Sequence, residues 1–190
     1  GHEISEPLMG HDMDRARELF TEAGYDGSPV IILQATDTPG NSGAALMTAQ
    51  LLREAGIKVE LQAMDWSTLT SRRAEKKSIE DGGWNIFHTS WIAPDLLNPV
   101  ANIGVSGGGV EKAWFGWPTD AEVEALRQDF ARETDSAKQK ALADKVQARA
   151  MDVVTYVPIG QYLGKYAYRE DKIKGILKGP VTFFWNIQPK

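Results

Sequence analysis

The sequence contains no cysteine, and this absence removes several kinds of chemistry. Disulfide bonds, zinc sites built on thiolates and thiol nucleophiles all need cysteine side chains, so none of them is available to this chain. The cellular compartment stays open, because proteins without thiols occur in the periplasm and in the cytoplasm alike. His88 is the single credible histidine ligand, so we expect no metal site and no cofactor.

An excess of positive charge and long apolar runs are also missing. The formal net charge is -5, which disfavours nucleic acid and anionic membrane surfaces as partners, because binding to both depends on clustered lysine and arginine. No apolar run approaches the ~20 residues that cross a bilayer. The remaining composition, 42% hydrophobic and 25% charged over 190 residues, predicts one globular domain with a core. The opening Gly1-His2-Glu3 is interpreted as the remnant of an expression tag, so that a signal peptide would have been lost upstream.

The first third of the chain has the pattern of an α/β fold. Asp12 is a candidate N-cap for a helix that ends at Gly24. A short apolar run over residues 29–35 indicates a buried strand, a helix follows over residues 43–55, and residues 57–63 alternate like a strand with one exposed face. A strand, a helix and a strand at this spacing form a βαβ unit, so the two strands should be parallel with a right-handed crossover.

The middle of the chain combines a helix, a strand and a long irregular stretch. Asp65 is expected to cap a helix that runs to about Lys76, and residues 84–91 are predicted as a third strand. Residues 92–118 contain three prolines and three consecutive glycines, which predict a long ordered loop. Long loops in compact domains are usually functional.

The last third is predicted as two helices followed by two strands. Thr119 and Glu122 form the Thr-x-x-Glu pattern of a capping box that opens a helix, and Asp135 opens another. Residues 157–163 and 181–187 are predicted strands. The whole is an α/β fold, a mixed sheet with a parallel βαβ core and helices on its faces. The helix positions expected to face inward are Met47, Leu51, Leu52, Val123, Leu126, Phe130, Leu142, Val146, Ala150 and Val153.

Five features in a fixed order carry a resemblance to a known family. They are the stretch 12–25, the stretch 51–61, Asp65-Trp66 followed by Arg72-Arg73, Trp91 ahead of an acidic proline-containing loop, and Val157-Pro158-Ile159 followed by a closing aromatic strand. Their joint order resembles the carboxy-terminal lobe of bacterial ABC-transporter solute-binding proteins of the peptide/nickel/opine class. The resemblance implies a two-lobed fold of the type II periplasmic-binding-protein kind, of which residues 1–190 supply a single lobe. Residues 165–190 would belong either to this lobe or to the other one.

The resemblance also implies a function. The two lobes would close on a small or peptide-like ligand and deliver it to an ABC permease in the membrane, and the amino-terminal lobe of the same protein is missing from this chain. The protein would be periplasmic or extracellular, either lipid-anchored or soluble, and it would not be an enzyme. A sensory or adaptor module that binds the same ligand without transporting it is the alternative. The apolar tail of the isolated lobe is expected either to fold back onto its own sheet or to be buried against a second copy, with dimerisation favoured at high concentration.

Aromatic side chains gather in the predicted loop, with polar groups between them. Ring faces supply contact area and polar groups fix orientation, which suits an amphipathic ligand. The competing interpretation is that these rings cover the domain core, and for Gln161 and Tyr162 the competing interpretation is a hydrogen bond at the end of the strand 157–163. The predicted ligand-binding residues are Trp91, Asp95, Asn98, Trp114, Trp117, Gln161 and Tyr162.

Asp95 departs from the pattern of the family that the chain resembles. In dipeptide and oligopeptide binders of that family, a carboxylate three residues after the matching tryptophan pairs with the free ammonium group of the peptide. That position is Pro94 here, and Asp95 follows it. Asp95 either replaces the carboxylate or caps a loop or a short helix, and a conventional free peptide is therefore not assured as the ligand.

Three further features of the sequence have simple structural interpretations. Gly104-Val105-Ser106-Gly107-Gly108 fits the nucleophile elbow of serine hydrolases, but all three histidines precede Ser106, so a hydrolase is disfavoured. His88 is expected to be packed in the fold or to line the cleft. The charged helix positions Arg72, Arg73, Lys76 and Lys77 are expected to be solvated surface.

Overall fold

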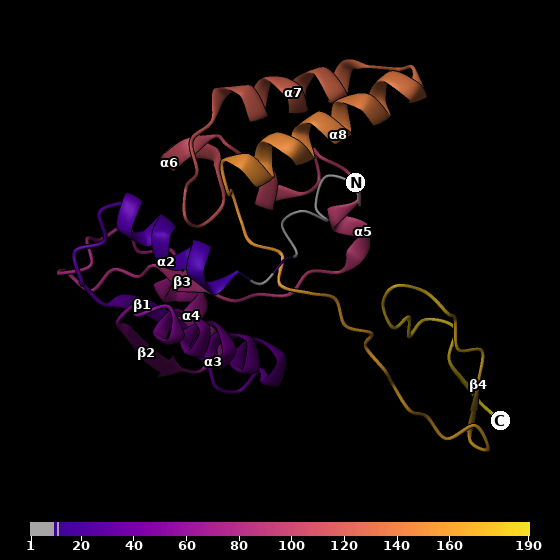
Figure 1. Ribbon diagram of the computed structural model, residues 1–190. Helices are drawn as coiled ribbons and strands as arrows, with labels where there is room; N and C mark the ends of the chain where they lie inside the picture. Colours follow the sequence, from indigo (N-terminus) through magenta and orange to yellow (C-terminus); the bar gives the residue numbers. More distant parts are fainter. Residues whose placement is uncertain (1–9, 11) are drawn as a thin grey trace. The chain divides into compact units, whose positions relative to one another are not determined.

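The structure is a computed structural model that describes residue 10 and residues 12–190 (Figure 1). The expected tag remnant at residues 1–3 lies outside these residues. The contacts divide the chain into two compact units, which are described separately: the first comprises residues 1–90 and 106–121, and the second comprises residues 91–105 and 122–190. Across the described residues, no helix combines the length and the apolar character needed to span a membrane.

The first unit is built on a three-stranded parallel sheet in the order β2-β1-β3. Strands β1 (Val30–Ala35) and β2 (Val59–Met64) pair along their whole length, and helix α3 (Pro39–Glu54) connects them. The predicted βαβ unit is therefore confirmed. The third strand is shorter than expected, because only β3 (Ile86–Phe87) pairs with β1. Just before it, the side chain of Asn85 accepts a hydrogen bond from the Ile31 amide (2.8 Å), which replaces a backbone bond of the ladder.

Strand β1 is the centre of the core. Ile32 packs with Ala45 and Ala49 of α3, and Leu33 and Ala35 pack with a leucine of α4 (Trp66–Arg72). These two sets form separate clusters because successive side chains of a strand point to opposite faces of the sheet. The small alanines let the backbone of α3 approach the sheet closely.

The predicted inward face of α3 was partly wrong. Leu52 packs against the core as expected, but Met47 is 67% exposed and Leu51 is 42% exposed. The buried stripe instead follows Ala45, Ala49 and Leu52, which are spaced four and three residues apart on one helix face. Hydrophobicity alone favoured the larger side chains, whereas close contact with the sheet selected the small ones.

Three aspartates begin helices as predicted. Asp12 accepts from the Arg15 amide (2.8 Å) before α2 (Met13–Glu22), and Asp65 accepts from the Thr68 amide (3.0 Å) before α4. Asp135 accepts from the Lys138 amide (2.9 Å) before α8 (Ser136–Asp152). Each carboxylate satisfies an amide that the first turn of a helix leaves free. Helix α4 ends at Arg72, earlier than the expected end near residue 76.

The predicted capping box was wrong. Helix α7 (Ala121–Arg132) begins two residues after Thr119, which instead forms a β-bridge with Gly108. The carboxylate of Glu122 lies 3.2 Å from Arg149 of α8 rather than folding back onto the start of its own helix. The local pattern was overridden by a tertiary ion pair.

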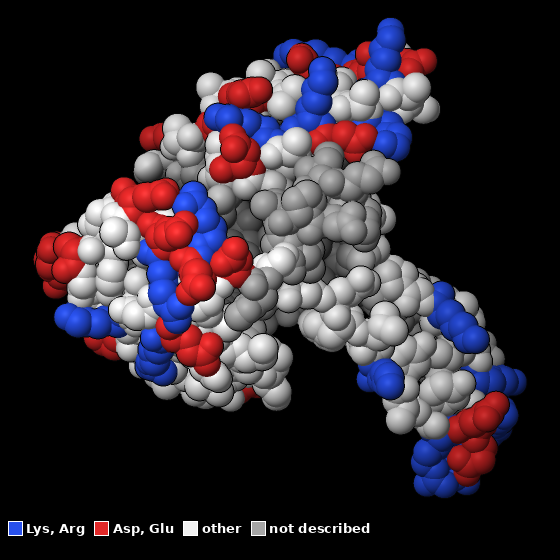
Figure 2. All heavy atoms as spheres, viewed as in Figure 1, with Lys and Arg blue, Asp and Glu red and all other residues white. Residues whose placement is uncertain are grey.

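Helices α7 and α8 lie side by side in the second unit (Figure 1). Their core contains Val105, Val146 and Ala150, with Leu126 and Tyr156 packed against them. The predicted inward positions of both helices are confirmed at these sites, and Val123 is also fully buried. Figure 2 shows basic and acidic side chains intermixed over the two helices, so this view has no patch of one sign there.

The predicted loop over residues 92–118 contains three short helical elements. In the second unit these are α5 (Ala93–Leu96) and the 3-10 helix η2 (Ile103–Val105), and in the first unit α6 (Gly109–Lys112). The stretch is ordered, as expected, but it does not lack secondary structure.

The predicted strands of the tail were wrong. Residues 157–163 form no regular structure, and of the stretch 181–187 only Phe183 makes a β-bridge, to Leu177. The tail contains one small antiparallel pair, β4 (Ile173–Lys174) with β5 (Gln188–Pro189). An alternating sequence becomes a strand only where a neighbour accepts its backbone hydrogen bonds. Among the described residues, no strand offers such a neighbour to residues 157–163.

Candidate ligand-binding site

The carboxyl edge of the sheet in the first unit gathers polar groups from several elements. After β1, Asp37 accepts from the Trp66 amide (2.8 Å), which ties the end of β1 to the start of α4. After β3, Ser90 donates to the side chain of Asn41 in α3 (2.9 Å). Ligands of open α/β sheets bind outside the carboxyl ends of the strands, so this edge is a candidate ligand-binding site.

Six aromatic rings form a cluster in the same unit, which we call the aromatic cluster. Phe87, the last residue of β3, lies within 5.1 to 6.4 Å of three of the other rings, measured between ring centroids. Three of its rings, those of Trp66, Trp84 and Phe87, pack against the buried side chains of Leu33, Ala35 and Leu69 on the α4 side of the sheet. Its members are Trp66, Trp84, Phe87, Trp114, Phe115 and Trp117.

The guanidinium of Arg73 lies within this cluster. Its Cζ is 4.5 Å from the ring centre of Phe115 and 5.4 to 5.5 Å from those of Trp66, Phe87 and Trp114. Such contacts stabilise a cation through the negative faces of the rings. The expectation that Arg73 is solvated surface was therefore wrong. Trp66 begins α4 and Arg73 is its C-cap, seven residues later, a spacing that places both on one face.

Arg73 is a charged group without a matching anion. Burial lowers the pKa of its guanidinium from the ordinary value, but arginine stays charged at neutral pH. Among the described residues, no carboxylate forms an ion pair with Arg73, and its buried Nε has no hydrogen-bond partner. Within the described part of the chain, the indole nitrogen of Trp84 in the same cluster is likewise buried without a partner. The guanidinium of Arg73 is a cation that no described carboxylate pairs with, and such a group suits an anionic ligand.

Two of the predicted site residues, Trp114 and Trp117, are brought together in the aromatic cluster. Trp114 packs against Phe87, with ring centroids 5.5 Å apart, and Trp117 packs against Trp84 at 6.0 Å. The φ angle of Trp117 is 50°, in the left-handed region that residues other than glycine seldom adopt. Both rings are half-buried, so they contribute to packing and still present surface to solvent.

The second unit holds three more predicted residues along one segment. Trp91 is 41% exposed and precedes α5. Asp95 lies inside the first turn of α5, whose N-cap is Ile92, so Asp95 is not the N-cap of this helix. The side-chain oxygen of Asn98 accepts from the Val100 amide (2.8 Å) and shapes the turn after α5.

Gln161 and Tyr162 do not lie at the end of a strand, because no strand forms there. Both are exposed, and the side chain of Tyr162 is 72% exposed. The alternative interpretation of Gln161 and Tyr162, a hydrogen bond at the end of a strand, was therefore wrong.

The remaining sequence patterns have structural explanations. Ser106 is 5% exposed, and its hydroxyl accepts from the Gly108 amide (3.4 Å). A buried serine in a glycine-rich turn lacks the exposed position that a nucleophile elbow needs. His88 is packed, as expected: its Nε2 lies 2.9 Å from the hydroxyl of Thr48, and burial lowers the pKa of its imidazole. Within the described part of the chain, no group of three histidine or acidic side chains is placed to hold a metal ion.

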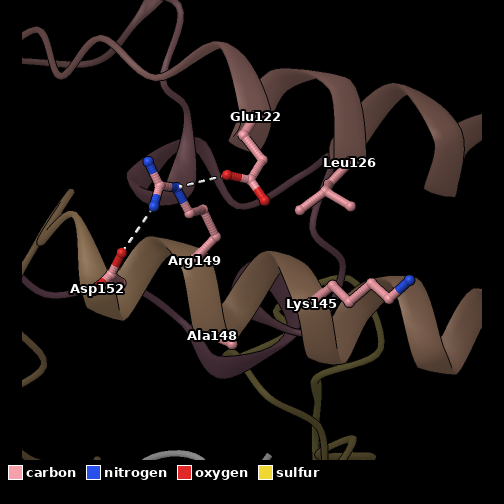
Figure 3. A pocket seen from close by; sticks show the side chains of 6 residues that line it. All are labelled: Glu122, Leu126, Lys145, Ala148, Arg149 and Asp152. Atoms are coloured by element: carbon pink, nitrogen blue, oxygen red, sulfur yellow. Dashed lines mark hydrogen bonds and ion pairs between the residues drawn. The ribbon is translucent and has the colours of Figure 1, made fainter.

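A shallow groove lies between α7 and α8 (Figure 3). Arg149 spans it, with Nε 3.2 Å from Glu122 and Nη1 2.8 Å from Asp152. Leu126 and Lys145 also line the groove. Both carboxylates are already paired with Arg149, and the residues that line the groove include no aromatic ring, so we favour the aromatic cluster as the candidate site.

Comparison with known proteins places the chain in a family. The model described as "Bacterial extracellular solute-binding proteins, family 5 Middle" matches residues 2–111. A Sinorhizobium fredii protein named "Probable peptide ABC transporter periplasmic-binding protein" is 39% identical over 179 residues, which cover 94% of this chain and 33% of that protein. Di/tripeptide-binding protein 4 of Pseudomonas aeruginosa is 24% identical over 180 residues, covering 90% of this chain and 32% of that protein.

A solved structure supports the same fold. A periplasmic oligopeptide-binding protein from Borrelia burgdorferi matches with a TM-score of 0.74 at 20% sequence identity, over 94% of this chain and 36% of that one. The chain thus spans about a third of the length of the relatives it matches. On the strength of the family match, the chain belongs to the family 5 bacterial extracellular solute-binding proteins.

Proposed function

We propose that this chain is the carboxy-terminal lobe of the solute-binding protein of an ABC importer. The complete protein binds a peptide-like solute between two lobes in the periplasm or outside the cell and delivers it to a membrane permease. It acts as a binding protein and not as an enzyme. The proposal is supported by the family match and by the names of two relatives, which bind peptides or belong to peptide transporters.

The observation that carries the proposal is Arg73 among the aromatic rings. A peptide-like solute combines apolar side chains with a carboxylate. The rings of Trp114 and Trp117 supply contact area, and the guanidinium supplies charge-assisted hydrogen bonds that no acidic residue of the described chain already occupies. The left-handed backbone of Trp117 is consistent with a functional position, because strain of this kind collects at ligand sites.

We also propose that the segment from Trp91 to Asn98, which lies in the second unit, contacts the solute. Asp95 is the acidic residue nearest to the position where related binders pair with a peptide ammonium, and Trp91 and Asn98 flank it. Gln161 and Tyr162, in the same unit, are proposed to contact the solute as well. A carboxylate such as that of Asp95 suits the ammonium group of a peptide-like solute.

The proposal is tested in the full-length protein with a pair of arginine variants. Trialanine and its carboxy-terminal amide are titrated into the parent, Arg73→Gln and Arg72→Gln. Arg72 is the matched control, because it bonds the carbonyl oxygen of Gly82 (2.8 Å) and contacts none of the rings. We expect Arg73→Gln to weaken trialanine binding by ~10-fold or more, the value of one charged hydrogen bond.

The amide separates a carboxylate contact from a general loss of structure. If Arg73 meets the carboxylate, amidation weakens binding in the parent and in Arg72→Gln but changes little in Arg73→Gln. A parent that binds neither peptide would sink the assignment of a peptide-like solute. Equal sensitivity to amidation in all three proteins would remove Arg73 from the site.

A further inference from the structure

Arg127 of α7 is a charged side chain that the second unit keeps largely from solvent. The side chain is 13% exposed, and its Nη1 lies 2.6 Å from a carboxylate oxygen of Glu124. Nε donates to the carbonyl oxygen of Pro99 (2.9 Å), and Nη2 donates to that of Val100 (3.1 Å). One planar guanidinium thus holds two successive backbone carbonyls, a geometry that the single ammonium of lysine cannot reproduce.

The turn that Arg127 holds is braced by its own side chains. Asn98 accepts from the amides of Val100 (2.8 Å) and Ala101 (3.3 Å), and its carbonyl oxygen accepts from the Asn102 amide (2.8 Å). Asn102 is 6% exposed, and three residues later Val105 enters the core formed with α8. The segment from residue 98 to residue 105 is therefore fixed to α7 through Arg127 and to α8 through Val105.

Helix α5 leads directly into this braced turn. It has four residues, no side-chain cap and no buried residue. A helix this short is not stable by itself, so its position depends on what holds its ends. The anchored turn begins at Asn98, two residues beyond the end of α5.

We propose that Arg127 is a positioning residue for the segment that carries Trp91, Asp95 and Asn98. The proposal rests on the ligand-binding function proposed above. Arg127 does not touch the solute; it fixes where α5 ends and thereby where Asp95 stands. Helices α7 and α8 then hold the segment that follows α5 in a fixed position, α7 through Arg127 and α8 through Val105.

The test compares Arg127→Met, Arg127→Lys and a matched control in the full-length protein. Arg132→Met is the control, because Arg132 lies on the same helix, is 75% exposed and stands 3.9 Å from Asp129. Hydrogen exchange is measured at the amides of residues 100–102, with the α8 amides of Val146 and Ala150 as internal reference. Trialanine affinity is measured on the same samples.

Both Arg127 variants are expected to raise exchange at residues 100–102 and to weaken trialanine binding, each by about tenfold, since two charge-assisted hydrogen bonds are lost or misplaced. The α8 amides and the Arg132→Met protein should be unchanged. Exchange that rises equally in α8 would show a general structural role and overturn the proposal. A parent that binds trialanine and an Arg127→Met protein that binds it equally well would overturn it too. A parent that binds no trialanine fails the proposed function, and the positioning role with it.

Discussion

Single residues show how far local rules reach in this chain. The caps Asp12, Asp65 and Asp135 were predictable, because an aspartate bonding the amide three residues on is a local event. Arg73 was not predictable, because its environment is made by rings from residues 66 to 115 that only the fold brings together. The spacing of Trp66 and Arg73 along one helix face was the available signal, but it does not say which rings arrive from elsewhere.

His88 gives a prediction about pH. Burial lowers the pKa of its imidazole below the ordinary value of 6.5, so the fold favours the neutral form. The unfolded chain then takes up a proton at higher pH than the folded chain does. The stabilising contribution is complete above the unfolded pKa and is lost as pH falls through the folded pKa, with a slope of at most ~1.4 kcal/mol per pH unit.

The measurement is urea unfolding of the parent and of His88→Gln between pH 7.5 and pH 5. Glutamine keeps a polar partner for Thr48 but does not titrate, and the other histidines are common to both proteins. We expect the parent to lose more stability than the variant as pH falls. Parallel stability curves would show that His88 is not desolvated in the fold.

At the scale of elements, the βαβ unit was predictable and the tail strands were not. The unit follows from contiguous sequence, since β1, α3 and β2 are consecutive and each has its own periodicity. The stretches 157–163 and 181–187 are rich in apolar residues typical of strands, but no sheet within the described chain includes them. A strand forms only when another strand pairs with its backbone, so the local sequence of a segment does not by itself predict that the segment becomes a strand.

The packing of α3 against β1 yields a prediction about core volume. Ala49 is fully buried against Ile32, so a leucine there adds volume that the sheet cannot accommodate. We expect Ala49→Leu to lower the free energy of unfolding by about 1–3 kcal/mol. The control is Met47→Leu on the same helix, where the side chain is 67% exposed, and its effect should stay within about 0.5 kcal/mol. Chemical denaturation of both variants decides the matter, and equal effects would mean that the stripe is misassigned.

At the scale of the whole molecule, the family was predictable because its signal is spread over the chain. Segments that are individually weak occur in one order, and the family match covers residues 2–111. The site was harder to predict from the sequence. The seven predicted residues fall in two units, and the structure brings only Trp114 and Trp117 together in one cluster. The chain spans about a third of the length of its relatives, and it exposes a surface of large apolar side chains.

That surface is most evident in the tail, which gives the last prediction. Leu163 is 80% exposed, Phe184 is 73% exposed and Trp185 is 77% exposed. Large apolar side chains that are exposed together mark a surface that associates, and the short β4–β5 pair leaves strand edges open. We therefore expect the isolated chain to dimerise through residues 157–190 at high concentration.

Light scattering across a concentration series measures this association directly. Hydrogen exchange at residues 176–187 should slow as the dimer forms, because the interface excludes water from these amides. The double variant Phe184→Ser and Trp185→Ser removes the two most exposed rings of the segment and should shift dimerisation to higher concentration. Met47→Ser removes a side chain of α3 that is 67% exposed and should not shift it. A chain that stays monomeric while its tail amides exchange freely would contradict the prediction. It would place the boundary of the folded lobe before residue 157.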